Sequence, residues 1–269
     1  MKFKSYSLKE ISINPLALVT GASAGIGLKI AQELAERGHD IIAVGSSERV
    51  SSVSEKITGV QIYPVQADLT ADEGIEKIWS TFESQGRNLD VAVLNAGKSL
   101  GGSFHDTDLD EELYMLNLNV ISQVKLAKRV VRQLAQQRDA RILITTSMSA
   151  LTPTPFESIY GPTRAFMYSF AQGLREEMKD YNVSVAALLP GATATDFHHT
   201  AKMDNTKFGD NSWKNEPALV AKLGVDALFA GKDHVIGGSE ATQKDAQRKR
   251  TMSDIEKAEE FARTSRPSK

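Results

Sequence analysis

The sequence contains no cysteine and no long apolar run, and each absence excludes a class of protein. Without cysteine among its 269 residues, the chain has no disulfide framework, thiolate metal site or cysteine nucleophile. No apolar run approaches the ~20 residues of a membrane span. The opening MKFKSYSLKE also lacks the apolar core of a signal peptide. We therefore expect a soluble, cytoplasmic protein without a membrane partner.

A strong net charge of either sign is also lacking. The formal net charge is −2, with 25% charged residues, so no electrostatic argument favours nucleic acid as a partner. The pair His198 and His199 suggests a metal, but adjacent side chains seldom reach one ion, and no nearby ligand set has a recognised spacing. We predict no metal site.

Apolar, strand-like runs alternate with amphipathic, helix-like segments along the chain. Most of the runs are continuously apolar, as expected for strands buried on both faces. They cover residues 16–21, 40–45, 60–66, 90–95, 141–146, 182–190 and 233–238. The helix-like segments cover residues 27–38, 48–57, 71–85, 108–138, 158–180 and 216–230. This alternation predicts an α/β fold of the Rossmann-like, doubly wound type, with a mainly parallel seven-stranded sheet flanked by helices in a single domain.

The last part of the chain has a different composition. Residues 239–269 are polar and rich in Lys, Arg, Glu and Ser. Ile255, Ala258 and Phe261 offer only a thin apolar stripe. We therefore place the domain at residues 1–238 and interpret 239–269 as a polar C-terminal tail, a marginal surface helix with a frayed end.

A glycine-rich turn, TGASAGIG (20–27), follows the first predicted strand and opens the first predicted helix. This is the position expected of a nucleotide-binding loop. Gly21, Gly25 and Gly27 permit a tight turn and close backbone approach to a pyrophosphate, which the helix N-terminus beyond would attract. An ordinary glycine-rich turn between a strand and a helix is the alternative.

The end of the second predicted strand bears on the form of the nucleotide. NAD-selective sites place a carboxylate there, on the ribose 2′-hydroxyl. In this chain no carboxylate appears before Glu48, and Gly45, Ser46 and Ser47 leave room for a 2′-phosphate, with Arg49 close in sequence. The pattern favours NADP(H), with NAD(H) as the alternative.

Seven motifs in order resemble those of the short-chain dehydrogenase/reductase family, over about residues 14–238. They are TGASAGIG (20–27), Asp68-Leu69, LNAG (94–97), NLNV (117–120), TTS (145–147), YGPTR (160–164) and PGATATD (190–196). Each motif alone is weak evidence for the family, whereas seven motifs in order at workable spacing are strong evidence. The resemblance implies a single-domain oxidoreductase that transfers a hydride between a nicotinamide cofactor and a carbonyl compound or secondary alcohol.

The resemblance assigns a role to each matching residue. Ser147 and Tyr160 would bond the substrate carbonyl oxygen, and Asn119 would position a water of the proton relay, with Asn117 as the alternative. Negative charge develops on that oxygen, so a neutral hydroxyl can stabilise it and a tyrosine can protonate it. The residues that would contact the cofactor are Gly21, Ser23, Gly25, Ile26, Gly27, Ser46, Ser47, Asp68, Leu69, Asn95, Ala96, Gly97, Tyr160, Arg164, Pro190, Gly191 and Thr195.

One residue departs from the family pattern. Arg164 stands four residues after Tyr160, where the family has lysine. A fixed cation one helical turn away can still favour the phenolate. The guanidinium is larger than an ammonium, however, and is effectively never deprotonated. Two hypotheses follow: a working reductase with an arginine variant of the catalytic set, or a nucleotide-binding sensor or scaffold with little or no catalysis.

The resemblance also concerns the substrate side and assembly. Substrate contacts are expected in residues 98–106, 148–158 and 192–213, the last a mobile lid. Phe104, Met148, Phe156, Phe197, Phe208 and Trp213 are candidates for an apolar wall. Family members commonly pair on the two long helices predicted at 108–138 and 158–180, which implies a homodimer, with a tetramer as the alternative.

Overall fold

The computed structural model describes residues 14–137 and 139–268. Within this part of the chain, seven parallel strands form one sheet in the order β3-β2-β1-β4-β5-β6-β7. The expectations about the first ten residues lie outside the described residues. The strands are β1 (Leu16–Thr20), β2 (Asp40–Gly45), β3 (Ile62–Gln66), β4 (Val91–Leu94), β5 (Ala140–Thr145), β6 (Val183–Pro190) and β7 (His234–Gly237). The predicted doubly wound, parallel fold is confirmed.

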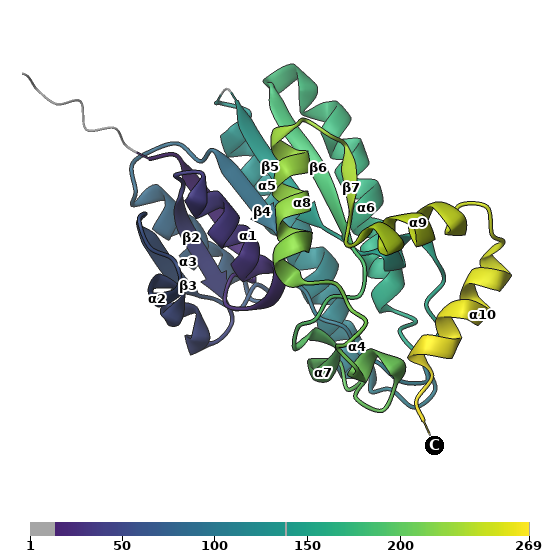
Figure 1. Cartoon of the computed structure of the whole chain (residues 1–269). Helices are drawn as coiled ribbons and strands as arrows, with labels where there is room; N and C mark the ends of the chain where they lie inside the picture. The colour runs from purple at the N-terminus through teal and green to yellow at the C-terminus, as the bar shows by residue number, and fades with distance from the viewer. Residues whose placement is uncertain (1–13, 138, 269) are drawn as a thin grey trace, which may run out of the picture.

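Helices cover both faces of the sheet (Figure 1). One apolar core lies between the sheet and α1, α2 and α8, and the other between the sheet and α3, α5 and α6. No helix of the described residues has the length and apolarity to cross a bilayer. The α-helices are α1 (Gly25–Glu36), α2 (Val53–Lys56), α3 (Asp72–Glu83), α4 (Leu109–Leu116), α5 (Ser122–Leu134), α6 (Tyr160–Glu177), α7 (Phe197–Thr200), α8 (Pro217–Phe229), α9 (Glu240–Lys249) and α10 (Asp254–Ser265). Shorter turns are the 3₁₀ segments η1 (Glu48–Ser52), η3 (Met148–Leu151), η4 (Lys179–Tyr181) and η5 (Lys207–Gly209), and the π turn η2 (Asn117–Ile121).

The strand order places the candidate site. The first three strands follow one another toward one edge of the sheet, and β4 to β7 follow one another toward the other edge. This order reverses between β1 and β4, which are hydrogen-bonded parallel neighbours. In open α/β sheets, ligands bind in the crevice beyond the carboxyl ends of the strands at such a reversal. The loops that follow β1 and β4 carry the glycine turn and the LNAG motif, so the topology brings these two segments together.

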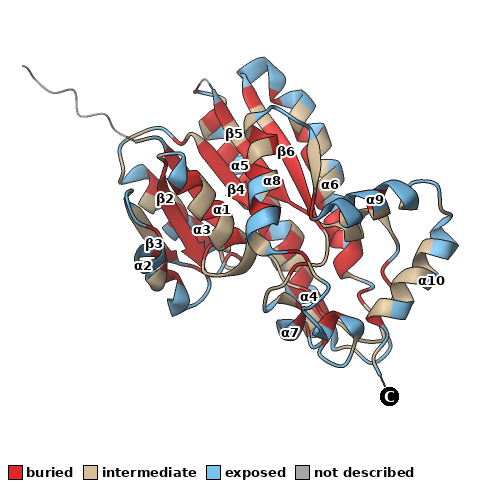
Figure 2. Cartoon of the chain, in the orientation of Figure 1, coloured by how far each residue is buried: buried red, intermediate tan, exposed pale blue. Residues whose placement is uncertain are grey.

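The C-terminal tail differs from its prediction. Instead of one frayed helix, residues 240–265 form α9 and α10, which extend beside the domain (Figures 1 and 2). A capping box closes the start of α10, where the Ser253 side chain accepts from the backbone of Glu256 and the Glu256 side chain accepts from that of Ser253. The far end of α10 is held by Ser265, which is fully buried and donates to the carbonyl of Pro155 at 2.7 Å. The capping box and the hydrogen bond of Ser265 explain why α10 is a regular helix, which its thin apolar stripe did not predict.

Candidate active site

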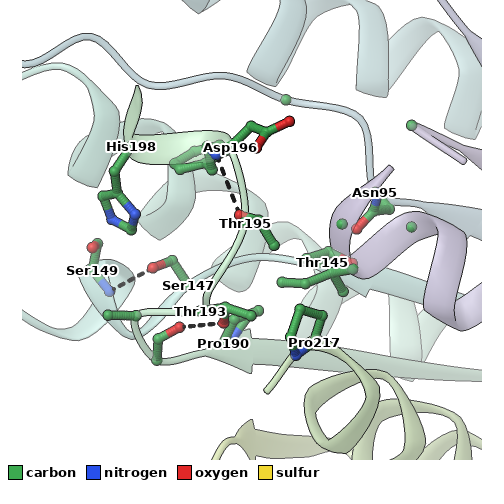
Figure 3. A pocket seen from close by; sticks show the side chains of 18 of the residues that line it. Asn95, Thr145, Ser147, Ser149, Pro190, Thr193, Thr195, Asp196, His198 and Pro217 are labelled. Carbon is green, nitrogen blue, oxygen red and sulfur yellow. Dashed lines mark hydrogen bonds between the residues drawn. The ribbon is translucent and has the colours of Figure 1, made fainter. Parts of the chain in front are cut away.

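A single cavity of about 1020 Å³ brings the predicted site residues together at the carboxyl ends of the strands (Figure 3). Of the residues predicted for catalysis or cofactor contact, all line this cavity except Ser47 and Asn119. Ser47 begins the exposed turn η1, and Asn119 is fully buried behind the cavity wall. Residues far apart in sequence therefore contribute to one site.

The glycine turn leaves the N-terminus of α1 open toward the cavity. Gly21 has a φ of 68°, in the left-handed region that favours glycine. A Cβ atom on Gly27 would collide with the Gly21 carbonyl oxygen, so this position also requires glycine. The residue that precedes α1, Ala24, provides no side-chain cap. The first N–H groups of α1 are therefore available to an anion, in the manner of a pyrophosphate site.

Basic side chains surround the end of the cavity nearest β2. Lys29, Arg49 and Lys56 all belong to its lining, whereas Glu48 does not. Arg49 is largely exposed and its guanidinium lies 3.7 Å from the Asp196 carboxylate. The cavity that Ser46 lines thus also contains three basic side chains, and Glu48, the first carboxylate after β2, does not line it.

Asp68 and Leu69 form the wall beside this basic end. Leu69 is buried, and the Asp68 carboxylate accepts from the backbone N–H of Thr70 at 2.9 Å and from its hydroxyl at 2.8 Å. Both residues line the cavity. An apolar side chain and a carboxylate held by a short turn suit contact with a planar base.

Ser147 and Tyr160 lie at the opposite end of the cavity. Ser147 follows β5, and its hydroxyl oxygen accepts from the backbone N–H of Ser149 at 3.0 Å, so the hydroxyl hydrogen can be donated elsewhere. Tyr160 begins α6 and is 8% exposed. Burial raises the pKa of the Tyr160 phenol, whereas the charge of Arg164 and a hydrogen bond with Ser147 oppose the rise.

Arg164 is buried beside Tyr160 without a carboxylate partner in the described chain. Its guanidinium carbon lies 5.1 Å from the centre of the tyrosine ring, and Nη1 donates to the Thr145 carbonyl at 3.4 Å. Nε and Nη2 are buried without a partner among the described residues. Such donors are costly unless a ligand or water accepts from them.

The guanidinium has room because of a glycine. A Cβ atom on Gly97 would lie 2.5 Å from Arg164 Nη2 and 3.0 Å from Asn119 Oδ1. Gly97 belongs to the LNAG motif that follows β4. The motif therefore allows the loop to pass directly over the arginine.

Asn119 connects the loop after β4 to the start of α6. Its Nδ2 donates to the Lys98 carbonyl at 2.8 Å and to Thr163 Oγ1 at 3.1 Å, and its Oδ1 accepts from the Lys98 N–H at 3.0 Å. It lies in the π turn η2, which interrupts the regular helical pattern, as is frequent at functional sites. Asn117, the alternative, donates instead to Thr70, at 3.5 Å.

The loop after β6 and the C-terminal helices contribute aromatic side chains to the cavity lining. Met148, Phe197, Phe208 and Trp213 line the cavity as predicted. Two other candidates for the apolar wall do not. Phe104 is 59% exposed, and the Phe156 ring instead contacts the Arg266 guanidinium, with 4.8 Å between the ring centre and the guanidinium carbon.

The two adjacent histidines lie in different environments. His198 stacks on Phe208 with 4.6 Å between ring centres, and burial followed by the charge of Lys214 lowers its pKa to about 3. His199 is exposed, and its Nδ1 donates to the Asp204 carboxylate at 2.8 Å. His198 is therefore an uncharged part of the cavity wall.

Sequence reasoning missed two features of the cavity. Glu157, three residues before Tyr160, is a buried carboxyl in the lining. It lies in the segment 148–158 expected to contact substrate, but no pattern within that segment distinguished it. Eight residues of the C-terminal tail also line the cavity: Ser239, Ala241, Thr242, Asp245, Lys249, Glu260, Phe261 and Thr264. Only Phe261 could have been suspected, as the one large aromatic side chain of a polar tail.

A dinucleotide fits this arrangement. The open helix N-terminus suits the pyrophosphate, and the unpartnered Arg164 N–H groups suit ribose hydroxyls. Thr195 follows Gly191 on the loop after β6 and lies across from the glycine turn, with its Cγ2 3.1 Å from where a Cβ on Gly25 would stand. The loops after β1 and β6 thus enclose the space between them.

Comparison with known proteins gives a consistent result. A family model described as short chain dehydrogenase matches residues 15–206. The chain is 34% identical over 217 residues to an uncharacterized short-chain type dehydrogenase/reductase of Sinorhizobium fredii, covering 79% of this chain and 85% of the relative. It is 29% identical over 218 residues to the NADP-dependent 3-hydroxy acid dehydrogenase YdfG of Salmonella typhimurium, covering 80% and 87%.

Solved structures agree with the sequence comparison. A short-chain dehydrogenase from Sphingobium yanoikuyae in complex with NADPH has a TM-score of 0.77 at 27% identity, over 87% of this chain and 92% of that one. A 7beta-hydroxysteroid dehydrogenase has a TM-score of 0.79 at 21% identity, over 93% and 100%, and shares the fold.

Proposed function

The chain belongs to the short-chain dehydrogenase/reductase family, and we propose that it transfers a hydride between NADP(H) and a carbonyl compound or secondary alcohol. The observation that carries this proposal is the convergence of Ser147, Tyr160 and Arg164 at one end of a cavity whose other end is an open helix N-terminus. Reduction needs a hydrogen-bond donor, a proton donor and a dinucleotide site together. These three residues and the glycine turn supply them.

The residues act on the carbonyl oxygen. The bound nicotinamide cofactor supplies the hydride to the carbonyl carbon in reduction and accepts it in oxidation. Ser147 donates its free hydroxyl hydrogen to the oxygen and stabilises the charge that develops there. Tyr160 transfers its proton to the same oxygen, so the products are an alcohol and a phenolate. In the oxidation direction, the phenolate takes the proton back.

Arg164 stabilises the phenolate. Its charge is the largest influence that lowers the pKa of Tyr160 against burial. Because arginine stays protonated, it acts as a fixed charge and ribose ligand rather than as a proton carrier. Asn119 holds the Lys98 backbone and Thr163 in place around it, which makes Asn119 a positioning residue for α6.

The basic end of the cavity supports NADP(H) over NAD(H). Lys29, Arg49 and Lys56 line the same cavity as Ser46, whereas Glu48, the first carboxylate after β2, does not. A 2′-phosphate would gain charged partners there. NAD(H) lacks the 2′-phosphate and so offers these basic side chains no anion.

The test compares both cofactors and several substrates. Fluorescence titration is expected to give a lower Kd for NADPH than for NADH, and Arg49→Ala should reduce that preference about tenfold. A panel of ketones and aldehydes assayed with NADPH should show turnover that Tyr160→Phe abolishes. Tight NADPH binding without turnover of any member, unchanged in Arg164→Lys, would instead support the sensor or scaffold.

A further inference from the structure

Glu157 is a buried acid in the catalytic cavity that the proposed mechanism does not use. It lies in the loop between η3 and α6, three residues before Tyr160. Its side chain lines the cavity, and the residue is only 3% exposed. Its charge acts on the Tyr160 phenol and raises the pKa of that group. Glu157 and Tyr160 therefore line the same cavity.

The described chain gives this carboxyl one hydroxyl partner and no cation. Ser99 donates to Glu157 Oε1 at 2.5 Å and is itself buried. Burial raises the pKa of Glu157 to about 7, and only the Ser99 hydrogen bond opposes the rise. A buried carboxylate is stable only when a charge or several hydrogen bonds compensate it.

The basic groups that line the substrate end do not fill this role. Arg164 lies over the Tyr160 ring and is not among the groups that act on Glu157. Lys249 pairs with Asp245 at 2.8 Å. His198 is uncharged at neutral pH because its pKa is about 3. No cation of the described chain compensates Glu157, so a cationic ligand is the partner that would favour its ionised form.

We propose that Glu157 binds a protonated amine of the substrate, so that the enzyme acts on amino ketones and the corresponding amino alcohols. This inference rests on the proposed hydride transfer at Tyr160. Because Glu157 and Tyr160 line the same cavity and stand three residues apart in the chain, a substrate that carries its amine near the carbonyl carbon can contact both. A ketone of the same shape without the nitrogen leaves the Glu157 carboxyl buried without a cationic partner.

A matched pair of ketones tests the proposal. 1-Methyl-4-piperidone carries a protonated amine where 4-methylcyclohexanone has carbon, at nearly equal volume. With NADPH, the wild-type protein should prefer the amine by at least about tenfold in kcat/KM, as expected for one compensated charge. Glu157→Gln, which keeps an acceptor for Ser99, should remove this preference while changing kcat/KM for 4-methylcyclohexanone less than about threefold.

A second glutamate provides the control. Glu112 is also buried and also accepts from a hydroxyl, that of Thr107 at 2.7 Å, but it does not line the cavity. Glu112→Gln should keep the amine preference. An equal loss of activity on both ketones in Glu157→Gln would show a structural role and overturn the proposal. A wild-type protein without amine preference would overturn it as well.

A binding measurement separates the two proposals. Calorimetry with the NADP⁺-loaded protein compares 1-methyl-4-piperidinol with 4-methylcyclohexanol. Tighter binding of the amine that Glu157→Gln removes, without turnover of either ketone, supports the amine site and contradicts hydride transfer. Turnover of both ketones without any amine preference supports hydride transfer and contradicts the amine site.

Discussion

The guanidinium carbon of Arg164 lies 5.1 Å from the centre of the Tyr160 ring, and both residues are buried. Burial alone would make the Tyr160 phenol a poor acid. The arginine charge is the main influence in the opposite direction. The spacing of one helical turn, with Gly97 leaving room for the guanidinium, therefore sets the acidity on which the proposed hydride transfer depends.

Removing the positive charge of Arg164 should impair catalysis more than replacing the guanidinium by the smaller ammonium of lysine. Arg164→Met removes the main influence that lowers the pKa of Tyr160, so we expect kcat/KM to fall by at least about 10². In alcohol oxidation, which needs the phenolate, the acidic limb of the pH–rate profile should move to higher pH. Arg164→Lys should keep the limb near its wild-type position. A pH profile that is the same in all three proteins would contradict this role.

Asn119 should stabilise the site more than its neighbour Asn117 does. Asn119→Ala removes three hydrogen bonds and leaves the part-buried Lys98 backbone N–H and carbonyl without these partners. Each unsatisfied buried group costs about 1–3 kcal/mol, so the free energy of unfolding in urea should fall by at least about 2 kcal/mol. Asn117→Ala loses one long contact and should cost less than about 1 kcal/mol. Equal costs would show that Asn119 has no special bridging role.

Glu157→Gln should stabilise the free protein at high pH only. The pKa of Glu157 is raised from 4.5 to about 7, so the folded state holds a proton that the unfolded state releases between these values. Stability therefore falls as pH rises through this window, and the penalty is complete above pH 7. Glutamine removes it, so the free energy of unfolding at pH 8 should rise by up to about 3 kcal/mol. The gain should vanish at pH 4, and a gain of equal size at both values would refute this explanation.

Phe261 should hold the substrate end closed. Its ring lies 5.8 Å from that of Phe208, which in turn stacks on His198. Phe261→Ala removes this contact between α10 and the loop after β6, so KM should rise about tenfold with little change in kcat, because the chemistry lies elsewhere. Ile255, on the same helix and 73% exposed, is the control, and Ile255→Ala should behave as the wild type. A fall in kcat with unchanged KM would contradict a closing role.

The predicted homodimer on the long helices can be tested at one aromatic residue. Phe166 on α6 is 48% exposed, as is Ile121 at the end of η2, and Phe166 stacks on Phe170. Large exposed apolar side chains of this kind mark contact surfaces. Phe166→Glu should convert a dimer to a monomer in size-exclusion chromatography with light scattering. A monomeric wild-type protein would refute the dimer.

Most of the fold was predictable because its signals are local. Continuous apolar runs such as that of β1 mark buried parallel strands, and Gly21 and Gly27 occupy positions where the backbone itself requires glycine. The order of the motifs along the chain sufficed to identify the family. The tail was predicted less well, because the buried Ser265 and its bond to Pro155 join residues 110 positions apart.

The sequence by itself determined the alternation of strands and helices, the glycine turn and the choice of Ser147, Tyr160 and Arg164 as candidate site residues, since each depends on residue type and spacing. Only the tertiary structure decided what surrounds them. Burial without a cation partner raises the pKa of Glu157 to about 7, and residues of two polar helices line the cavity. Desolvation and pairing depend on residues brought together from distant parts of the chain, and no local pattern records them.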